Sequence, residues 1–169
     1  MKIKTLDTLE DVQKLDGLLG DYIRFVCDDL ERAAGLTFDA DVLLANTVRS
    51  LSKVIPPEGQ TFVAETEDDD ILGMVFLRPS GNHDMEIKRL YVVPEGRGTG
   101  AGRALVEAAM TAARATGARS LRLDTAKNLK AAIGLYEDMG FAYRAPYPES
   151  DHFSDDELLP YLVFMEKRL

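Results

Sequence analysis

A glycine-rich turn between a predicted strand and a predicted helix constrains this chain more than any other feature. Glycine occupies positions 96, 98, 100 and 102, after the β-branched and aromatic run Leu90–Val93 and before an alanine-rich helical pattern. A strand-to-helix connection needs one or two glycines, and each further glycine costs conformational entropy on folding. The pattern therefore indicates a backbone that a ligand approaches closely. The adjoining helix N-terminus favours an anion such as phosphate.

Composition and charge narrow the class of protein. The 169 residues fit one domain, 1–169, with a sizeable core. A net charge of −9 argues against general nucleic-acid binding, which needs a basic face. The single cysteine, Cys27, excludes an internal disulfide and a zinc site of its own, so we expect no metal and a reducing, cytoplasmic location. Its apolar neighbours predict a small buried side chain. No apolar run approaches the roughly 18 residues of a membrane span, so we expect no membrane association.

The spacing of apolar residues predicts an α+β domain with a mixed sheet. Apolar residues spaced by three and four predict helices over 8–34, 100–116 and 127–139. The same spacing predicts one more helix, which Asp39 or Asp41 caps and which ends before Pro56. Gly17 and Gly20 are candidates for a break in the first helix, and Gly35 for its end. Alternating or β-branched runs predict strands at 1–6, 61–64, 71–77, 85–93, 120–124, 141–144 and 160–165.

Spacing excludes two common phosphate-binding turns. A P-loop needs a lysine and then a hydroxyl residue after its second glycine, and residues 96–104 contain no such pair. The dinucleotide turn G-x-G-x-x-G fails because its third glycine would fall at Arg103 or Leu105. A third pattern, Arg/Gln-x-x-Gly-x-Gly/Ala, is satisfied by Arg97, Gly100 and Gly102.

A second motif follows at residues 128–141, as Asn128-x-x-Ala131-x-x-x-Leu135-Tyr136-x-x-x-Gly140-Phe141. Together with Leu90-x-Val92-x-Pro94 before the turn, it makes residues 86–143 closely resemble the GNAT N-acetyltransferases. The resemblance implies the acyl-CoA N-acyltransferase fold, a central mixed and mostly antiparallel sheet flanked by about four helices. It also implies acetyl-CoA as co-substrate.

The resemblance assigns cofactor contacts to two segments. The main chain of Tyr91, Val92 and Val93 would pair with the acyl-carrying arm, and the N–H near Val92 would polarise the thioester carbonyl. Main-chain amides along the turn would hold the pyrophosphate, with charge added by its two arginines. The turn comprises Arg97, Gly98, Thr99, Gly100, Ala101, Gly102 and Arg103. Ala131 is a further expected contact, and Asn128 is either a contact or a helix cap.

Acyl transfer to an amine requires a neutral nitrogen. A lysine-like amine has a pKa near 10.4, so about one molecule in 2,500 is neutral at pH 7, a cost of roughly 4.6 kcal/mol. A nearby carboxylate can accept the proton. By resemblance, Glu86 is the expected base, and Tyr136 is the expected acid that protonates the thiolate leaving group. The alternative to a base role is that Glu86 occupies a solvated strand position beside Lys88. The alternative to an acid role is that Tyr136 only packs against its neighbours.

The sequence therefore predicts acetyl transfer to a primary amine of a small molecule by direct attack in a ternary complex. Protein lysine or N-terminal acetylation and a noncatalytic acyl-CoA sensor are the alternatives. Two acidic segments are expected to be solvated, Glu65–Asp70 as a hairpin turn and residues 149–157 as a loop. The second could instead attract a cationic acceptor such as a polyamine, an aminoglycoside or a basic peptide. His83 and His152 are expected in surface or loop roles, and a homodimer is suggested by family analogy alone.

Overall fold

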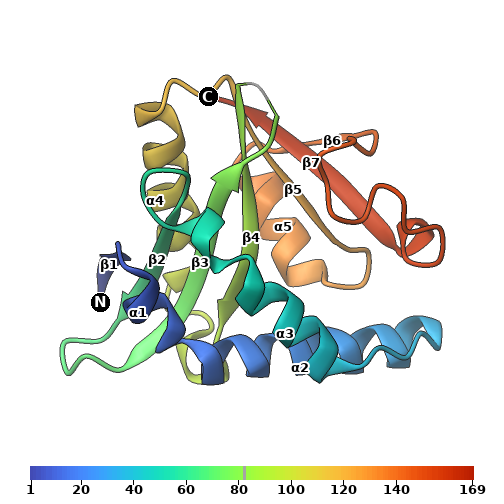
Figure 1. The fold of residues 1–169 in the computed structure, drawn as a ribbon, viewed down its shortest axis with the longest axis horizontal. Coiled ribbons are helices and arrows are strands. Elements are labelled where there is room, and N and C mark those ends of the chain that lie inside the picture. Colours follow the sequence, from blue (N-terminus) through green and yellow to red (C-terminus); the bar gives the residue numbers. More distant parts are fainter. Residues whose placement is uncertain (82) are drawn as a thin grey trace.

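The computed structural model describes residues 1–81 and 83–169, which form a seven-stranded sheet with helices on both faces (Figure 1). The strands are β1 (Lys2–Leu6), β2 (Gln60–Glu65), β3 (Ile71–Pro79), β4 (Asp84–Val92), β5 (Ser120–Ala126), β6 (Ala142–Arg144) and β7 (Leu162–Arg168). The α-helices are α1 (Leu9–Gln13), α2 (Asp16–Ala34), α3 (Ala40–Arg49), α4 (Ala101–Ala115) and α5 (Lys130–Asp138). Short 3-10 turns lie at Leu51–Val54, Pro94–Gly96 and Leu159–Tyr161. The predicted α+β class is confirmed.

The sheet is mixed, as expected. Its strand order is β1-β2-β3-β4-β5-β7-β6, and every neighbouring pair is antiparallel except β4 with β5. That parallel pair is short, since only residues 84–86 of β4 face residues 120–122 of β5. The two strands then separate, and Figure 1 shows the gap widening downward from their upper ends. Within the described residues, one edge of β4 therefore has no strand partner beyond Glu86.

Two apolar cores hold helices against opposite faces of the sheet. In β2, Phe62 and Ala64 pack into the cluster that contains α4 and Tyr136 of α5, whereas Val63 packs into the cluster that contains α1 and α2. This alternation is the period of two expected of a strand that is covered on both faces. Cys27 belongs to the second core and is buried, as predicted. No described helix combines the length and the apolarity needed to cross a membrane.

The first predicted helix is broken, although at neither of the glycines proposed for the break. The chain leaves helical geometry at residues 14–15, and Gly17 and Gly20 lie inside α2. Thr8 caps α1 by accepting the Asp11 N–H at 3.1 Å. The break lets Leu15, 2% exposed, join the second core. Gly35 ends α2 with φ +69°, as predicted.

Residues 66–70 form the predicted turn between β2 and β3, and residues 67–70 are exposed, as expected. Glu65 differs from its expectation, and one of the two alternatives for Asn128 is excluded. Glu65 is 5% exposed and lies in β2 rather than in a solvated turn, with Lys4 Nζ 3.5 Å from its carboxylate. Asn128 does not cap α5, because Leu129 occupies the N-cap position. Its side-chain amide instead donates to the Asp29 carboxylate on α2. Asn128 thereby ties the loop after β5 to α2.

Candidate active site

The glycines of the turn serve two structural purposes. A Cβ at Gly96 would lie 2.9 Å from the Leu72 carbonyl oxygen, and one at Gly102 would lie 3.3 Å from the Leu135 side chain. Packing within the protein explains these two glycines. Gly98 and Gly100 have φ of +77° and +89° with nothing within 4 Å of an added Cβ, so they serve the turn's backbone geometry and leave its outer side open.

The open side of the turn faces a groove of about 680 Å³ between α2, β4, α4 and α5. The first N–H groups of α4 have no partner within the helix, which suits them to an anion. Most of the predicted cofactor residues line this groove, namely Tyr91, Val92, Arg97, Gly98, Gly100, Ala101, Gly102, Arg103, Asn128 and Ala131. Two predicted cofactor residues, Val93 and Thr99, are not part of the lining. The Thr99 hydroxyl donates to the Gly96 carbonyl at 2.7 Å.

The backbone of β4 presents hydrogen-bonding groups to the gap beside β5. Val93 donates its N–H to the Leu72 carbonyl of β3 at 3.0 Å. Because successive N–H groups of a strand point to opposite edges, the Val92 N–H points away from β3. Arg89, with φ +56°, lies at a bulge in the same strand, where its register with β3 shifts. This geometry fits an extended ligand arm that pairs with β4 as an added strand.

Sequence reasoning missed the wall that α2 contributes to the groove. Tyr22 and Phe25 pack against Tyr91, with ring centroids 5.8 and 6.0 Å apart. The guanidinium of Arg97 lies 5.4 Å from the centre of the Phe25 ring. The aromatic residues of α2 follow the helical spacing of an ordinary apolar stripe, and their sequence carries no separate signal of a binding wall.

Tyr136 is 4% exposed and packs edge-on against Phe141. Tyr136 is not among the residues that line the groove. Burial, followed by the neighbouring Tyr22 and Asp124, raises the pKa of the Tyr136 hydroxyl. The side chain therefore remains protonated at neutral pH.

Glu86 is 0% exposed and is not a solvated strand position. Arg78 contacts one carboxylate oxygen at 2.7 Å, and Tyr147 donates its hydroxyl to the other at 2.6 Å. Lys88 lies 3.6 Å from the same carboxylate. Glu86 lines neither the groove nor the pocket described below. Both of its oxygens are thus held by cationic or hydroxyl donors from the protein itself.

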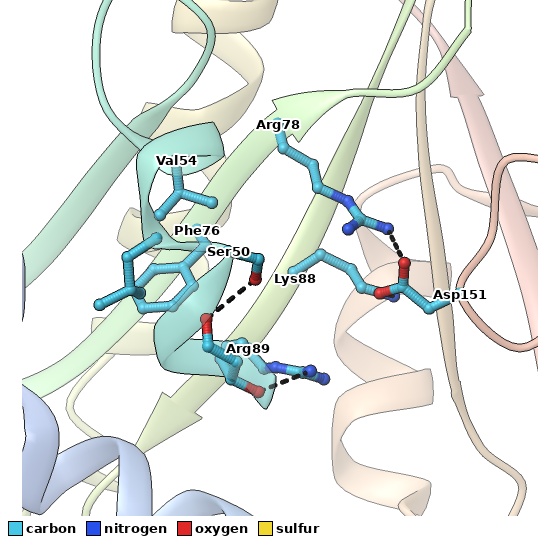
Figure 2. Close-up of a pocket in the computed structure, with 9 residues that line it drawn as sticks. Ser50, Val54, Phe76, Arg78, Lys88, Arg89 and Asp151 are labelled. Carbon is cyan, nitrogen blue, oxygen red and sulfur yellow. Dashed lines mark hydrogen bonds and ion pairs between the residues drawn. The ribbon is translucent and has the colours of Figure 1, made fainter. Parts of the chain in front are cut away.

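The ionic cluster around Glu86 extends to β5 and to the loop before β7. Lys88 contacts Asp124 at 3.1 Å and Asp151 at 3.5 Å. Figure 2 shows Arg78 and Lys88 converging on Asp151 beside a cavity of about 20 Å³. Burial lowers the pKa of Lys88, but the carboxylates of Asp124, Glu86 and Asp151 outweigh burial and raise it. The same cluster lowers the pKa of Asp151 to about 2 against the effect of its burial.

The acidic loop at residues 149–157 is mostly exposed, as expected, and three of its carboxylates also make contacts within the protein. Asp151 joins Arg78 at 2.9 Å, Glu149 lies 3.7 Å from Arg122, and Asp155 caps the Leu158 N–H at 2.9 Å. Asp151 and Glu149 therefore pair with basic residues of the sheet while both side chains stay partly exposed. Their partners lie far away in sequence, and the local pattern does not reveal them.

A second, smaller pocket of about 150 Å³ adjoins the groove. Tyr22 and Leu129 line both, so they form the boundary between the two. Apolar side chains from α2, α3 and the loop before β7 form most of its wall, and Asp124 and His152 are among its few polar groups. Sequence reasoning missed both, because a lone histidine and a strand aspartate 28 positions apart match no motif.

Asp124 and His152 have complementary electrostatic properties. Both contacts of the Asp124 carboxylate, from Lys88 and from Ser150 at 2.9 Å, fall on Oδ2. Among the described residues, Oδ1 accepts no hydrogen bond. Burial raises the pKa of Asp124, but Lys88 and His152 outweigh burial and lower it. Burial lowers the pKa of His152, so the imidazole is neutral at pH 7.

Comparison with known proteins identifies the family. The model of the acetyltransferase (GNAT) family matches residues 27–141, and the chain belongs to this family. An uncharacterised N-acetyltransferase of Schizosaccharomyces pombe is 38% identical over 137 residues, which cover 79% of this chain and 82% of that protein. The IAA acetyltransferase of Azospirillum brasilense is 30% identical over 152 residues, covering 89% and 93%.

Solved structures share the fold. The PaiA N-acetyltransferase from Thermoplasma acidophilum, solved in complex with coenzyme A, superposes with a TM-score of 0.66 over 100% of both chains, at 19% identity. This identity supports a common fold and no closer relation. The predicted acyl-CoA N-acyltransferase fold is confirmed.

Substitution of Gly100 by alanine is expected to weaken acetyl-CoA binding at least about tenfold, because the added Cβ enters the open side of a turn with positive φ. Gly117→Ala is the matched control, since Gly117 has φ +78°, an equally open surrounding and a place at the other end of α4. Both variants should lose about 1–2 kcal/mol of stability. Calorimetric titration with acetyl-CoA should separate them, and equal affinities would contradict a cofactor role for Gly100.

Proposed function

We propose that this chain transfers an acetyl group from acetyl-CoA to the primary amine of a small molecule while both substrates are bound. The observation that carries the proposal is the shared boundary of Tyr22 and Leu129 between the large groove and the small pocket. Acetyl-CoA supplies the acetyl group as a thioester. Two adjoining cavities hold two reactants side by side, so direct attack needs no covalent intermediate on the protein.

The groove suits coenzyme A in its chemistry. The open turn at Gly98 and Gly100 offers backbone N–H groups and the positive end of α4 to the pyrophosphate. Arg97 and Arg103 line the groove and add positive charge. The outward Val92 N–H would hydrogen-bond the thioester carbonyl oxygen, where negative charge develops during attack.

A small-molecule acceptor is favoured over a protein lysine or N-terminus by the size of the pocket, about 150 Å³. The Azospirillum brasilense relative is named for IAA, a small molecule. A protein substrate would need a longer open channel for its backbone.

The base role of Glu86 stays a prediction. The contacts of the Glu86 side chain disfavour direct contact with an amine. Its two oxygens already accept from Arg78 and Tyr147. We propose instead that Asp124 binds the substrate ammonium through its free Oδ1 and that His152 accepts the proton. A neutral imidazole can take a proton at pH 7, whereas a carboxylate with a lowered pKa is a weaker base. Glu86 then acts as a positioning residue for Arg78 and Lys88.

Tyr136 is proposed as the acid that protonates the thiolate of coenzyme A. Tyr136→Phe removes the proton and leaves the ring packing, so kcat should fall about tenfold to 100-fold while acetyl-CoA affinity stays unchanged. The matched control is Tyr143→Phe, at a tyrosine that is 57% exposed on β6. Thiol release would be followed for both variants, and a wild-type kcat for Tyr136→Phe would exclude the acid role.

Free-thiol release from acetyl-CoA, with mass detection of the acetylated product, tests the proposed function. The expected result is release that depends on a small primary amine. A noncatalytic acyl-CoA sensor would bind acetyl-CoA by calorimetry and release no thiol with any small amine or peptide. Acetylation of peptides alone would favour the protein acetyltransferase alternative.

A further inference from the structure

The pocket beyond Tyr22 and Leu129 is mostly apolar. Its apolar lining includes Val26 and Leu30 from α2, Leu43 from α3 and Leu158 from the loop before β7, and residues of β5 and β7 complete it. Leu30 and Leu158 also belong to a third buried cluster, separate from the two large cores. The pocket is therefore an unfilled part of a small apolar core, with a volume of about 150 Å³.

The polar lining of this pocket includes two carboxylates. Asp124 and Asp155 both line it, and the only lining cation among the described residues is Arg89. The Arg89 guanidinium donates to the Thr47 hydroxyl at 3.1 Å and lies 5.9 Å from the Tyr22 ring centre, and it keeps its charge. Lys88 lies 3.1 Å from Asp124 Oδ2 and balances part of the charge of this carboxylate. Asp124 Oδ1 accepts no hydrogen bond among the described residues, so this atom can accept one from a substrate ammonium.

We propose that the acceptor is a compact primary amine with a single ring or a branched alkyl group of similar size, the ammonium near Asp124 and Asp155 and the apolar group against α2 and α3. An apolar cavity of roughly this volume binds benzene in another protein. The match of size and charge defines the substrate class, and this inference rests on the proposed acetyl transfer.

The size and apolar lining of the pocket disfavour larger cations, although the acidic loop at residues 149–157 could attract them. A linear polyamine would place its second and third charges against Val26 and Leu30, where unpaired charge is costly. An aminoglycoside has several rings and many hydroxyl groups, which exceed the volume and lack partners in the apolar wall. A basic peptide carries a backbone that this pocket cannot hold.

The test compares 2-phenylethylamine, spermidine, kanamycin and a lysine-containing peptide as acceptors for the intact chain with acetyl-CoA. The expected kcat/KM for 2-phenylethylamine is at least about 100-fold above the values for the other three, given the apolar area that the ring buries. A higher kcat/KM for spermidine, kanamycin or the peptide overturns the inference and leaves acetyl transfer standing.

Two matched pairs of variants locate the ring and the charge. Leu43 lines the pocket and neighbouring Val42 does not, and both are exposed on α3, so tryptophan at either is compatible with folding. Leu43→Trp should raise KM for 2-phenylethylamine at least about tenfold, and Val42→Trp less than about twofold.

The second pair of variants locates the charge. Asp155→Asn, which keeps an oxygen to cap Leu158, should raise KM about threefold to tenfold. Asp156→Asn, at an exposed neighbour outside the lining, should not.

A separate binding measurement distinguishes failure of this inference from failure of the proposed function. If no amine releases thiol, acetyl transfer to amines fails. Calorimetric titration of 2-phenylethylamine into the protein saturated with coenzyme A then decides the inference alone. Binding that is lost in Leu43→Trp and kept in Val42→Trp supports the pocket assignment, and no binding, or equal binding in both, overturns it.

Discussion

Substitution of His152 by glutamine is expected to lower kcat for acetyl transfer about 100-fold to 10,000-fold, the range that a general base contributes. Glutamine keeps the approximate size and a polar end but cannot accept a proton at neutral pH. The KM for acetyl-CoA should stay unchanged, because His152 lines the small pocket and not the groove.

The pH dependence of kcat gives this prediction a second readout. Burial lowers the pKa of His152, the charges of Lys88 and Arg89 lower it further, and Asp124 and Asp151 oppose them. Only the neutral imidazole accepts a proton, so kcat should be constant at neutral pH and fall as pH drops through a midpoint below 6.5. Asp124→Asn removes a charge that raises this pKa, and the midpoint should move to lower pH.

The other histidine of the chain is the matched control. His83 is exposed in the turn before β4, and its one described hydrogen bond is made by its backbone carbonyl, so His83→Gln should leave kcat and its pH midpoint unchanged. A His152→Gln variant with the wild-type rate and the wild-type acidic limb would contradict a proton-accepting role.

Substitution of Glu86 by alanine is expected to lower the free energy of unfolding by about 3–5 kcal/mol. The side chain is fully buried between Arg78 and Lys88, and its loss leaves two buried cations with fewer carboxylate partners. Removal of one partner of a buried ion pair costs more than the pair contributes, since the remaining charge has lost its water. Thermal unfolding followed by circular dichroism should show a midpoint lowered by roughly 6–20 °C.

Glu149→Ala provides the comparison at the surface. Glu149 is 42% exposed and lies 3.7 Å from Arg122, so its removal should cost under about 1 kcal/mol. The conservative variant Glu86→Gln then separates positioning from catalysis. Measured where it is fully folded, it should retain kcat within about tenfold and keep the acidic midpoint of the wild type. A folded Glu86→Gln that loses more than about 100-fold in kcat would restore Glu86 as the base.

The sequence was sufficient to predict which segments line the large groove, the proposed cofactor site, because its determinants are local. The spacing of Arg97, Gly100 and Gly102 fixes one turn, and the strand before it leads directly into that turn. The motif from Asn128 to Phe141 belongs to one loop and one helix. Most of the residues predicted from these two segments line the groove.

The small pocket that we propose for the acceptor could not be predicted in the same way, because distant segments build it. His152 comes from a loop that is held near the sheet by Arg78 and Asp151, 73 positions apart. The alternation of residues along β4 predicts that Glu86 is solvated. In the structure Glu86 is buried and accepts a hydrogen bond from Tyr147, which lies 61 residues later in the sequence. A helical stripe also explained Tyr22 fully as a core residue, although it lines both cavities.

Initial rates of thiol release, measured while acetyl-CoA and the amine are varied together, decide whether the acetyl group passes directly from acetyl-CoA to the amine. Direct attack in a complex that holds both substrates predicts double-reciprocal lines that intersect, and an acetylated amine formed in equal amount with the thiol. Parallel lines, which indicate a covalent acetyl-protein intermediate, would contradict direct transfer.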